Sequence, residues 1–237
     1  MRFIKKQKPP KSLQNWIAAN QGRQTGKPTY RNIPGNVLAE IRLALLSEQG
    51  WLCAYTMIAI RHVEASHIEH VLAQAYFPDQ QVKYANMLAC HPGTEGQANC
   101  EFGALAKGGK IVTSMNFLSP LIPSCETRFV YETNGAIRTA QSDDQVANAT
   151  IDALKLDHPI LQKMRKEAVE AAGFTLRAAK PATVKETRAF LKTCTPSGNL
   201  GRLPEFCGAL GQLGADYLRR AEERAERLRA QRPPADA

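Results

Sequence analysis

Hydrophobic residues at helical spacing predict helices in the first fifth of the chain and through its C-terminal half. Over residues 36–48 the apolar positions fall three or four apart and share one helix face, and Asn36 is placed to cap that helix. Pro159 suits the first turn of a later helix, and Gly173 suits its C-terminal cap. The periodicity after position 145 predicts four helices, over residues 146–154, 159–172, 184–193 and 203–232.

Short extended segments separate these two helical regions. Residues 129–131 and 136–137 flank the dipeptide Asn134-Gly135, which favours the tight turn of a β-hairpin. Residues 65–71 and 85–89 are predicted to form the strands of a second, smaller core. The first twelve residues carry Pro9-Pro10 and many charges, so they should form an extended arm.

The densest group of reactive side chains is Ser66-His67-Ile68-Glu69-His70, followed downstream by Asn86. A carboxylate directly before a histidine, with an amide side chain later in the chain, suits metal-assisted cleavage of a phosphodiester. Glu69 can bind a hard cation through oxygen. His70 can act as general base because the pKa of histidine lies near neutrality. Asn86 can orient the imidazole by a hydrogen bond. A Glu-His pair alone is common on protein surfaces, so its neighbours must add to the argument.

Three cysteines surround this group: Cys53 precedes it, and Cys90 and Cys100 follow it. A structural zinc ion needs four tetrahedral ligands, so His91 or His62 would have to complete the set. The alternative is an apolar cluster that holds no metal. The remaining cysteines are expected to be buried as small apolar residues: Cys125, Cys194 and Cys207.

This order of Cys, Glu-His, Asn, Cys and Cys resembles the HNH, or ββα-metal, nucleases. Longer stretches resemble a narrower group, the PtuB-like HNH endonuclease subunits of Septu-type and retron-associated antiphage systems. One of them, Gln49-Gly50-Trp51-Leu52-Cys53-Ala54-Tyr55, is similar to the family's "Q-x-x-L-C-A-Y-C". Further likeness follows in the family's order over residues 1–10, 67–74, 123–135, 150–165 and 203–207.

The resemblance implies a catalytic Mg²⁺ or Mn²⁺ bound by Glu69, with His70 as the base. It also implies a third site residue on the helix after the second cysteine region, for which Glu101, Asn99 and His67 are the candidates. A separate SMC-like or ABC-type ATPase (PtuA-like) is the implied partner.

The chain departs from the family at three places. Val71-Leu72-Ala73 follows the Glu-His pair, where the family has Phe-x-Pro. Thr56 stands where the second cysteine of a Cys-x-x-Cys pair is usual, which puts a structural Zn²⁺ in doubt more than the catalytic histidine. Lys107-Gly108 follows the cysteines later than usual. The segment Lys107-Gly108-Gly109-Lys110 lacks the spacing of a phosphate loop, so no nucleotide site is predicted.

The charge balance favours a nucleic-acid partner. The 237 residues include 31 Lys and Arg against 22 Asp and Glu, a formal net charge of +9. A cation excess of this size suits phosphate backbones such as DNA, although much of it lies at the two ends of the chain. No apolar run is long enough to span a bilayer, and the basic N-terminus lacks the apolar segment of a secretory signal. A cytoplasmic location is therefore expected.

Together these patterns predict an α+β, mostly helical protein in three parts. Residues 1–47 form an N-terminal arm and helix, 48–118 a ββα-metal (HNH) nuclease core, and 119–237 a hairpin and helical C-terminal region. The expected function is a metal-dependent DNA endonuclease, the effector subunit of an antiphage complex. One alternative is a degraded HNH subunit that only binds nucleic acid or a partner, and another is a stand-alone restriction-type HNH nuclease.

The last predicted helix carries an apolar stripe with two possible uses. It could dock on the ATPase, or it could close the protein's own core. The stripe consists of Leu203, Phe206, Leu210, Leu213, Tyr217 and Leu218.

Overall fold

The computed structural model describes residues 1–22, 28–175, 180–195 and 201–230. Within these residues the chain forms seven α-helices and two two-stranded antiparallel sheets, which confirms the mostly helical α+β class. The helices are α1 (Lys11–Asn20), α2 (Gly35–Glu48), α3 (Ala104–Lys107), α4 (Gln145–Leu154), α5 (Pro159–Ala171), α6 (Val184–Thr193) and α7 (Cys207–Ala230). The strands are β1 (His67–His70) paired with β2 (Met87–Cys90), and β3 (Phe129–Tyr131) paired with β4 (Ile137–Thr139).

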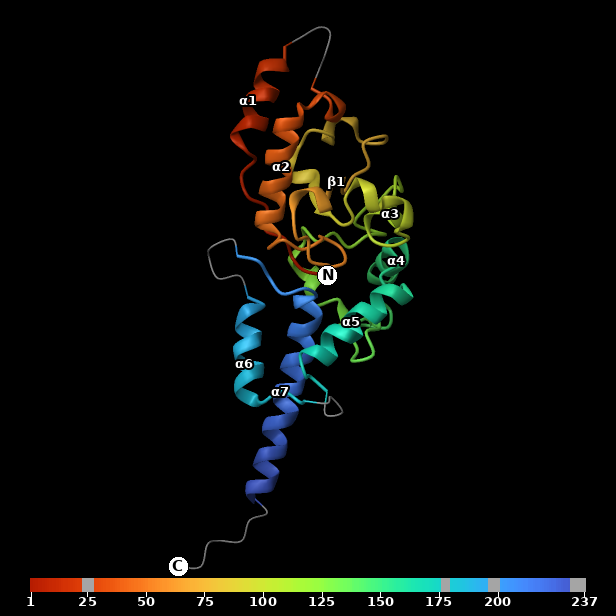
Figure 1. Cartoon of the computed structure of the whole chain (residues 1–237). Helices are drawn as coiled ribbons and strands as arrows, with labels where there is room; N and C mark the ends of the chain where they lie inside the picture. The colour runs from red at the N-terminus through yellow and green to blue at the C-terminus, as the bar shows by residue number, and fades with distance from the viewer. Residues whose placement is uncertain (23–27, 176–179, 196–200, 231–237) are drawn as a thin grey trace, which may run out of the picture.

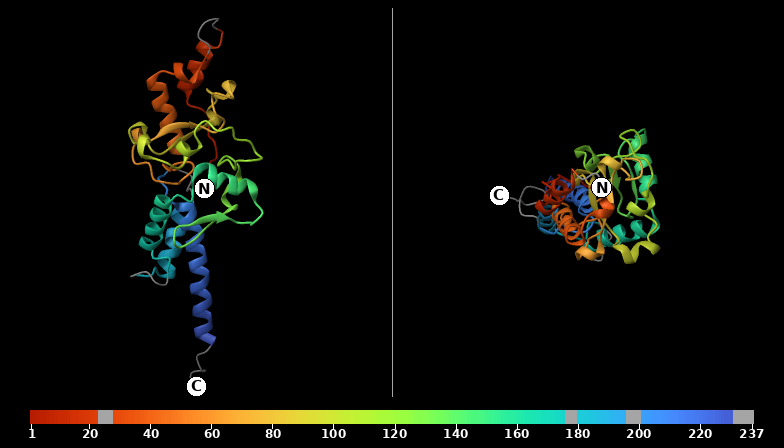
Figure 2. Two further views of the ribbon diagram at one scale, coloured as in Figure 1. Left: turned by 90° about the vertical axis from the view of Figure 1, so that its right-hand side faces the viewer. Right: turned by 90° about the horizontal axis from the view of Figure 1, so that it is seen from above.

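The molecule is elongated, and its elements follow one another along the long axis (Figures 1 and 2). Helices α1 and α2 lie at one end, the β1–β2 hairpin packs against α2, and α3 packs against α4. The β3–β4 hairpin packs against α4 and α7 in the middle, and α6 packs along α7 at the other end. One continuous hydrophobic core joins residues of all three predicted parts. The division into three parts stays a prediction.

The helices predicted after position 145 are confirmed, with small differences at their ends. Helix α5 begins at Pro159, and Gly173 beyond its end has a φ of 70°, the left-handed conformation of a C-terminal cap. Helix α7 begins at Cys207 rather than at position 203. The helix predicted over residues 36–48 is α2, but it starts at Gly35 after Pro34 without a side-chain cap, so the predicted Asn36 cap is wrong.

The N-terminal segment is extended, as predicted, but part of it lies inside the protein. Met1 and Ile4 are buried in the core, and the Ile4 amide donates to the carbonyl of Pro120 at 2.8 Å. The Lys6 ammonium pairs with the buried Glu48 and donates to the Met87 carbonyl at 3.0 Å. This lysine therefore holds β2 in place and is not free to bind a nucleic acid.

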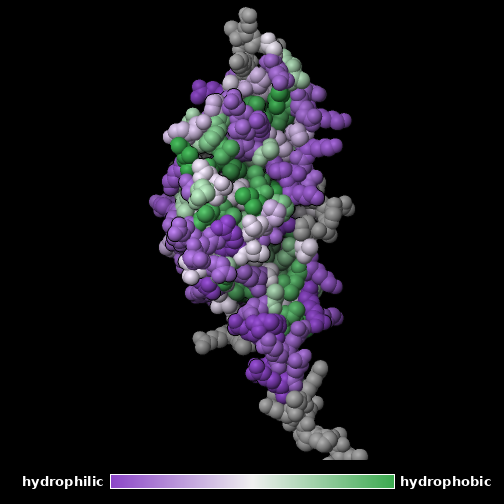
Figure 3. All heavy atoms as spheres, turned by 180° about the vertical axis from the view of Figure 1, so that it is seen from behind, coloured by the Kyte–Doolittle hydropathy of each residue, from purple (hydrophilic) through white to green (hydrophobic). Residues whose placement is uncertain are grey.

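The apolar stripe at the C-terminus closes the protein's own core. Phe206 and Leu210 are buried, and Leu203, Leu213 and Tyr217 pack against the same cluster. Backbone hydrogen bonds fix the start of this region, from Phe206 to Met57 at 3.0 Å and from Leu203 to Gly50 at 2.9 Å. The narrow end of the molecule, where α7 projects, is hydrophilic, whereas hydrophobic residues gather on the broader part (Figure 3). Five of the six residues of the stripe are thus used internally, whereas Leu218 is half-buried and not part of this cluster.

Among the described residues, no helix combines the length and the apolar character needed to cross a membrane.

Candidate active site

The candidate catalytic residues lie on the β1–β2 hairpin. The strands pair antiparallel, with His67 opposite Cys90 and His70 opposite Met87. Side chains alternate between the two faces of a strand, so His70 and Glu69 are directed to different surroundings. All four residues of β2 are buried, which makes the hairpin part of the core rather than a surface ribbon.

Gln49 fixes the outer edge of β2. Its side-chain nitrogen donates to the Ala89 carbonyl at 2.8 Å, and its side-chain oxygen accepts from the Ala89 amide at 2.8 Å. The same nitrogen also donates to the carbonyl of Leu52 at 2.8 Å. A buried amide side chain satisfied in this way replaces the backbone partner that an edge strand lacks. The end of α2 and the cysteine turn are thereby tied to the strand that faces β1.

The His70 imidazole is anchored on both of its nitrogens. Nε2 lies 2.8 Å from the carbonyl oxygen of Gln81, which can only accept, so Nε2 carries the proton. Nδ1 then accepts from the side-chain amide of Gln74 at 2.9 Å. The ring of Tyr30 meets the imidazole edge-on, with centroids 4.7 Å apart. Burial lowers the pKa of His70, because the charged imidazolium loses its hydration. The residue is therefore a neutral imidazole whose Nδ1 lone pair is directed at Gln74.

Asn86 does not play the part predicted for it, which was to orient the imidazole directly. Its side-chain oxygen accepts from the Leu72 amide at 2.8 Å. Its side-chain nitrogen donates to the carbonyls of Leu72 at 3.0 Å and Gln80 at 3.3 Å. Asn86 thus clasps the loop between β1 and β2, the loop that brings Gln74 and Gln81 to His70. Its effect on the imidazole is indirect.

Glu69 faces a lysine. The Nζ atom of Lys107 lies 2.7 Å from Oε1 of Glu69, at ion-pair distance although outside hydrogen-bonding geometry. Lys107 is 1% exposed. Burial raises the pKa of Glu69, and the neighbouring Lys107 opposes this rise by stabilising the carboxylate. The carboxylate expected to bind a divalent ion is thus already neutralised by a cation of the chain itself.

The other candidate metal ligands are engaged elsewhere. Nδ1 of His67 lies 2.6 Å from the carbonyl oxygen of Pro92. The Glu101 side chain is 75% exposed and lies 3.6 Å from Nε2 of His158, so the structure does not place it at Glu69. Asn99 is exposed. Across the described residues, no three or more His, Cys, Asp or Glu side chains are grouped so that they could hold a metal ion.

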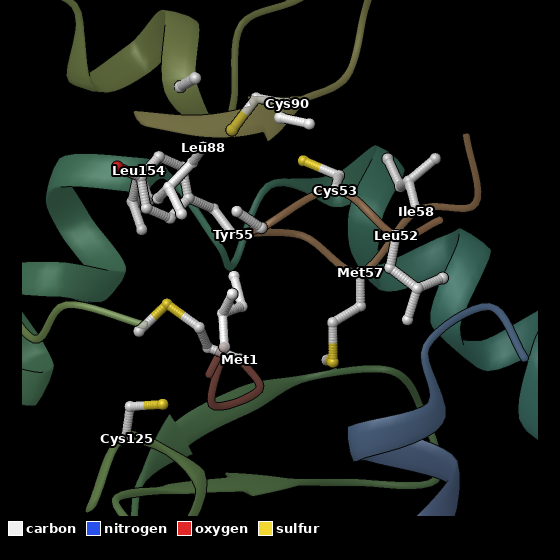
Figure 4. Packing of buried hydrophobic residues seen from close by; sticks show 14 of the residues in the cluster. Met1, Leu52, Cys53, Tyr55, Met57, Ile58, Leu88, Cys90, Cys125 and Leu154 are labelled. Atoms are coloured by element: carbon white, nitrogen blue, oxygen red, sulfur yellow. The ribbon is translucent and has the colours of Figure 1, made fainter. Parts of the chain in front are cut away.

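Two of the predicted zinc ligands come together and the others do not. The thiols of Cys53 and Cys90 point toward one another in the core (Figure 4). Burial alone would raise the pKa of Cys53, but hydrogen bonds from Cys90 and Thr56 hold it well below its usual range. Burial and the neighbouring Cys53 raise the pKa of Cys90. The Cys100 thiol instead donates to the carbonyl of Phe102 at 3.5 Å, and His91 is half-buried. The set predicted for Zn²⁺ is therefore incomplete, and a structural zinc stays a prediction.

The three cysteines outside the candidate site follow the sequence prediction with one exception. Cys125 and Cys207 are buried in the core, whereas Cys194 is only partly buried. All six cysteines of the chain are free thiols in the structure.

Sequence reasoning missed four residues that shape the site: Tyr30, Gln74, Gln81 and Lys107. Gln81 acts through its backbone carbonyl, which no side-chain pattern reveals. Lys107 was noted as part of a displaced Lys-Gly pair and of a rejected phosphate loop, but not as a partner of Glu69. The sequence offered one signal for Lys107, which is its position in the chain. It follows the second cysteine region, where the family resemblance implied that a third site residue lies on a helix.

No family model matches the chain. A comparison with known proteins gives a relative in Vibrio cholerae serotype O1 biovar El Tor, named "Retron Vc95 putative HNH endonuclease". The two sequences are 26% identical over 191 residues, which cover 78% of this chain and 90% of the relative. The chain is similar to a retron HNH endonuclease. This likeness supports an HNH endonuclease in a retron setting, and the narrower likeness to PtuB-like Septu subunits stays a proposal.

Proposed function

We propose that this protein is an HNH-type DNA endonuclease of a retron-associated antiphage system, with His70 as its general base. The observation that carries the proposal is the anchored imidazole. The Gln81 carbonyl holds the proton on Nε2, so the Nδ1 lone pair is free to take a proton from water once Gln74 turns away. The likeness to the V. cholerae relative supports the reaction class.

The chemistry assigned to the chain's own residues is proton transfer. A water molecule on Nδ1 of His70 loses its proton to the imidazole as its oxygen attacks phosphorus. The bond to the leaving oxygen breaks with its electron pair, and this oxygen takes up a proton from solvent water. The imidazolium that forms is stabilised by its Nε2–H bond to the Gln81 carbonyl. Gln74 is partly exposed, and its side-chain amide occupies the position on Nδ1 of His70 that the water must take. Substrate binding therefore has to displace this amide.

A divalent ion does not fit the donor set as it stands. Mg²⁺ and Mn²⁺ prefer several oxygen ligands in a near-octahedral arrangement. The Glu69 carboxylate is paired with Lys107, and Glu101 and His67 make other contacts. No step of the reaction is therefore assigned to the metal, and the Mg²⁺ or Mn²⁺ requirement expected from the sequence remains part of the proposal.

The same proposal includes DNA as substrate, an SMC-like or ABC-type (PtuA-like) ATPase as partner, and a cytoplasmic site of action. The net charge of +9 supports the DNA substrate. The ATPase is proposed from the family resemblance. Because the apolar stripe of α7 serves the protein's own core, a partner would have to use other surfaces.

Plasmid cleavage tests the nuclease. The purified protein should nick supercoiled DNA with Mg²⁺ or Mn²⁺, alone or after co-expression with a PtuA-like ATPase. His70→Ala should lower the rate by about a hundredfold or more, because the general base is lost. His62→Ala is the matched control, since His62 is exposed and, within the described residues, its side chain pairs with Glu64 and not with a residue of the candidate site. Equal cleavage by wild type and His70→Ala would contradict the proposed mechanism.

A degraded, non-catalytic HNH subunit is the second candidate. Two observations favour it: His70 is 5% exposed, and Glu69 is neutralised by Lys107. This alternative predicts that the wild type shows no cleavage in either preparation while the folded protein still binds DNA. A complex of this chain with a copurifying ATPase that shows no nuclease activity would fit the non-catalytic alternative equally well.

A further inference from the structure

Lys107 lies where the sequence places a divalent ion. It ends α3, a short helix whose preceding residue, Gly103, donates its amide to the carbonyl of Leu154 at 2.7 Å. The start of α3 is thereby fixed to the end of α4, and the helix delivers the lysine into the interior. A buried ammonium needs partners, because an isolated buried charge is costly.

Three oxygens surround the Lys107 ammonium. It donates to the carbonyl of His70 at 3.2 Å and to the carbonyl of Gly108 at 3.2 Å, and the Glu69 carboxylate lies at ion-pair distance, 2.7 Å away. Two of its three donors are thus used in hydrogen bonds, and the carboxylate balances its charge. Carboxylate and carbonyl oxygens are also the ligands that hard divalent ions take. The lysine and a divalent ion would therefore compete for the same oxygens.

We propose that the Lys107 ammonium takes the place of a divalent ion in this site and pairs with the Glu69 carboxylate. Mg²⁺ or Mn²⁺ then reaches Glu69 only when the ion pair between Lys107 and Glu69 opens. Lys107 is then a positioning residue that sets metal affinity, not a group that touches the reacting atoms. This inference rests on the proposed function, because it takes the region around Glu69 to be the active site of a nuclease. It is tested by metal binding without DNA, so its failure and the failure of the nuclease proposal are distinguishable.

Calorimetric titration with MnCl₂ at about pH 8, far above the usual pKa of a carboxyl group, measures the affinity directly. Lys107→Met keeps most of the side-chain volume and removes the charge. It should bind Mn²⁺ at least about tenfold more tightly than wild type, because the competing cation is gone. The double variant Glu69→Gln/Lys107→Met should lose this gain. Lys110→Met is the matched control, since Lys110 is exposed and should leave the affinity at the wild-type value.

A second variant decides the matter if Lys107→Met fails to fold. Glu69→Gln alone should leave the Mn²⁺ affinity of the protein within about twofold of wild type, because Glu69 is engaged with Lys107 and does not bind the ion at rest. Two results would overturn the proposal. One is a folded Lys107→Met variant that binds Mn²⁺ no better than wild type. The other is a loss of about tenfold or more in Glu69→Gln, which would make Glu69 a metal ligand in the resting protein.

Discussion

Replacing Asn86 with alanine should destabilise the fold, because this side chain clasps the loop between β1 and β2. The substitution removes three hydrogen bonds at 2.8–3.3 Å, to both backbone groups of Leu72 and to the carbonyl of Gln80. Asn86 is buried, so water does not readily replace them. At a net value of about 1 kcal/mol per bond, and more for groups left unsatisfied, we expect the free energy of unfolding to fall by about 2–4 kcal/mol.

Urea unfolding followed by circular dichroism measures this loss. Asn148→Ala is the matched control, since Asn148 is an exposed residue of α4 and alanine suits a helix. Asn86→Asp should be at least as harmful as alanine, because it keeps the acceptor for Leu72 but turns a carboxylate toward two carbonyls. If Asn86→Ala abolished cleavage while losing less than about 0.5 kcal/mol of stability, the residue would act on substrate and the loop-clasp reasoning would be refuted.

Four further predictions concern the imidazole and the core. Gln74→Ala should raise plasmid cleavage by about two- to tenfold, because the amide that covers Nδ1 of His70 is removed; a lower rate would mean that Gln74 assists the reaction. In the pH profile of kcat/KM, the midpoint of the acid limb should lie below the usual histidine value of about pH 6.5, since burial lowers the pKa of His70. Because the unfolded chain binds a proton on His70 at a higher pH than the folded protein does, the contribution of His70 to the free energy of unfolding should be complete above about pH 6.5 and be lost as the pH falls. His70→Gln should weaken this pH dependence. Phe206→Ala should cost about 3–5 kcal/mol in urea unfolding, whereas an interface role for the stripe would leave stability unchanged.

The sequence predicts those elements whose pattern is long or chemically specific. Helices α4 to α7 carry several turns of periodic apolar residues, and Asn134-Gly135 marks the β3–β4 turn. Helix α3 could not be predicted in this way, because four residues make little more than one turn and show no period. Helix α1 is short, and its apolar residues Leu13, Trp16 and Ile17 span little more than one turn, so its pattern was not singled out.

The site was predictable in its members but not in their partners. The sequence singles out Glu69, His70 and Asn86, and the structure places all three on or beside the hairpin. What each one contacts depends on residues distant in the chain or on backbone carbonyls. Lysines are almost never fully buried unless they are paired, so composition alone directs attention away from Lys107. The imidazole is held by the backbone carbonyl of Gln81. Every residue has such a carbonyl, so the sequence does not reveal which one makes this contact.

The central claim is that His70 is held as a neutral imidazole with its proton on Nε2 and its lone pair on Nδ1. Long-range ¹H–¹⁵N NMR of the labelled full-length protein reports the tautomer and the pKa of this ring, with His70→Gln identifying its signals. The account predicts the Nε2–H tautomer at neutral pH and a pKa below the usual value of about 6.5. An Nδ1–H tautomer, or an imidazolium that persists above that pH, would contradict it.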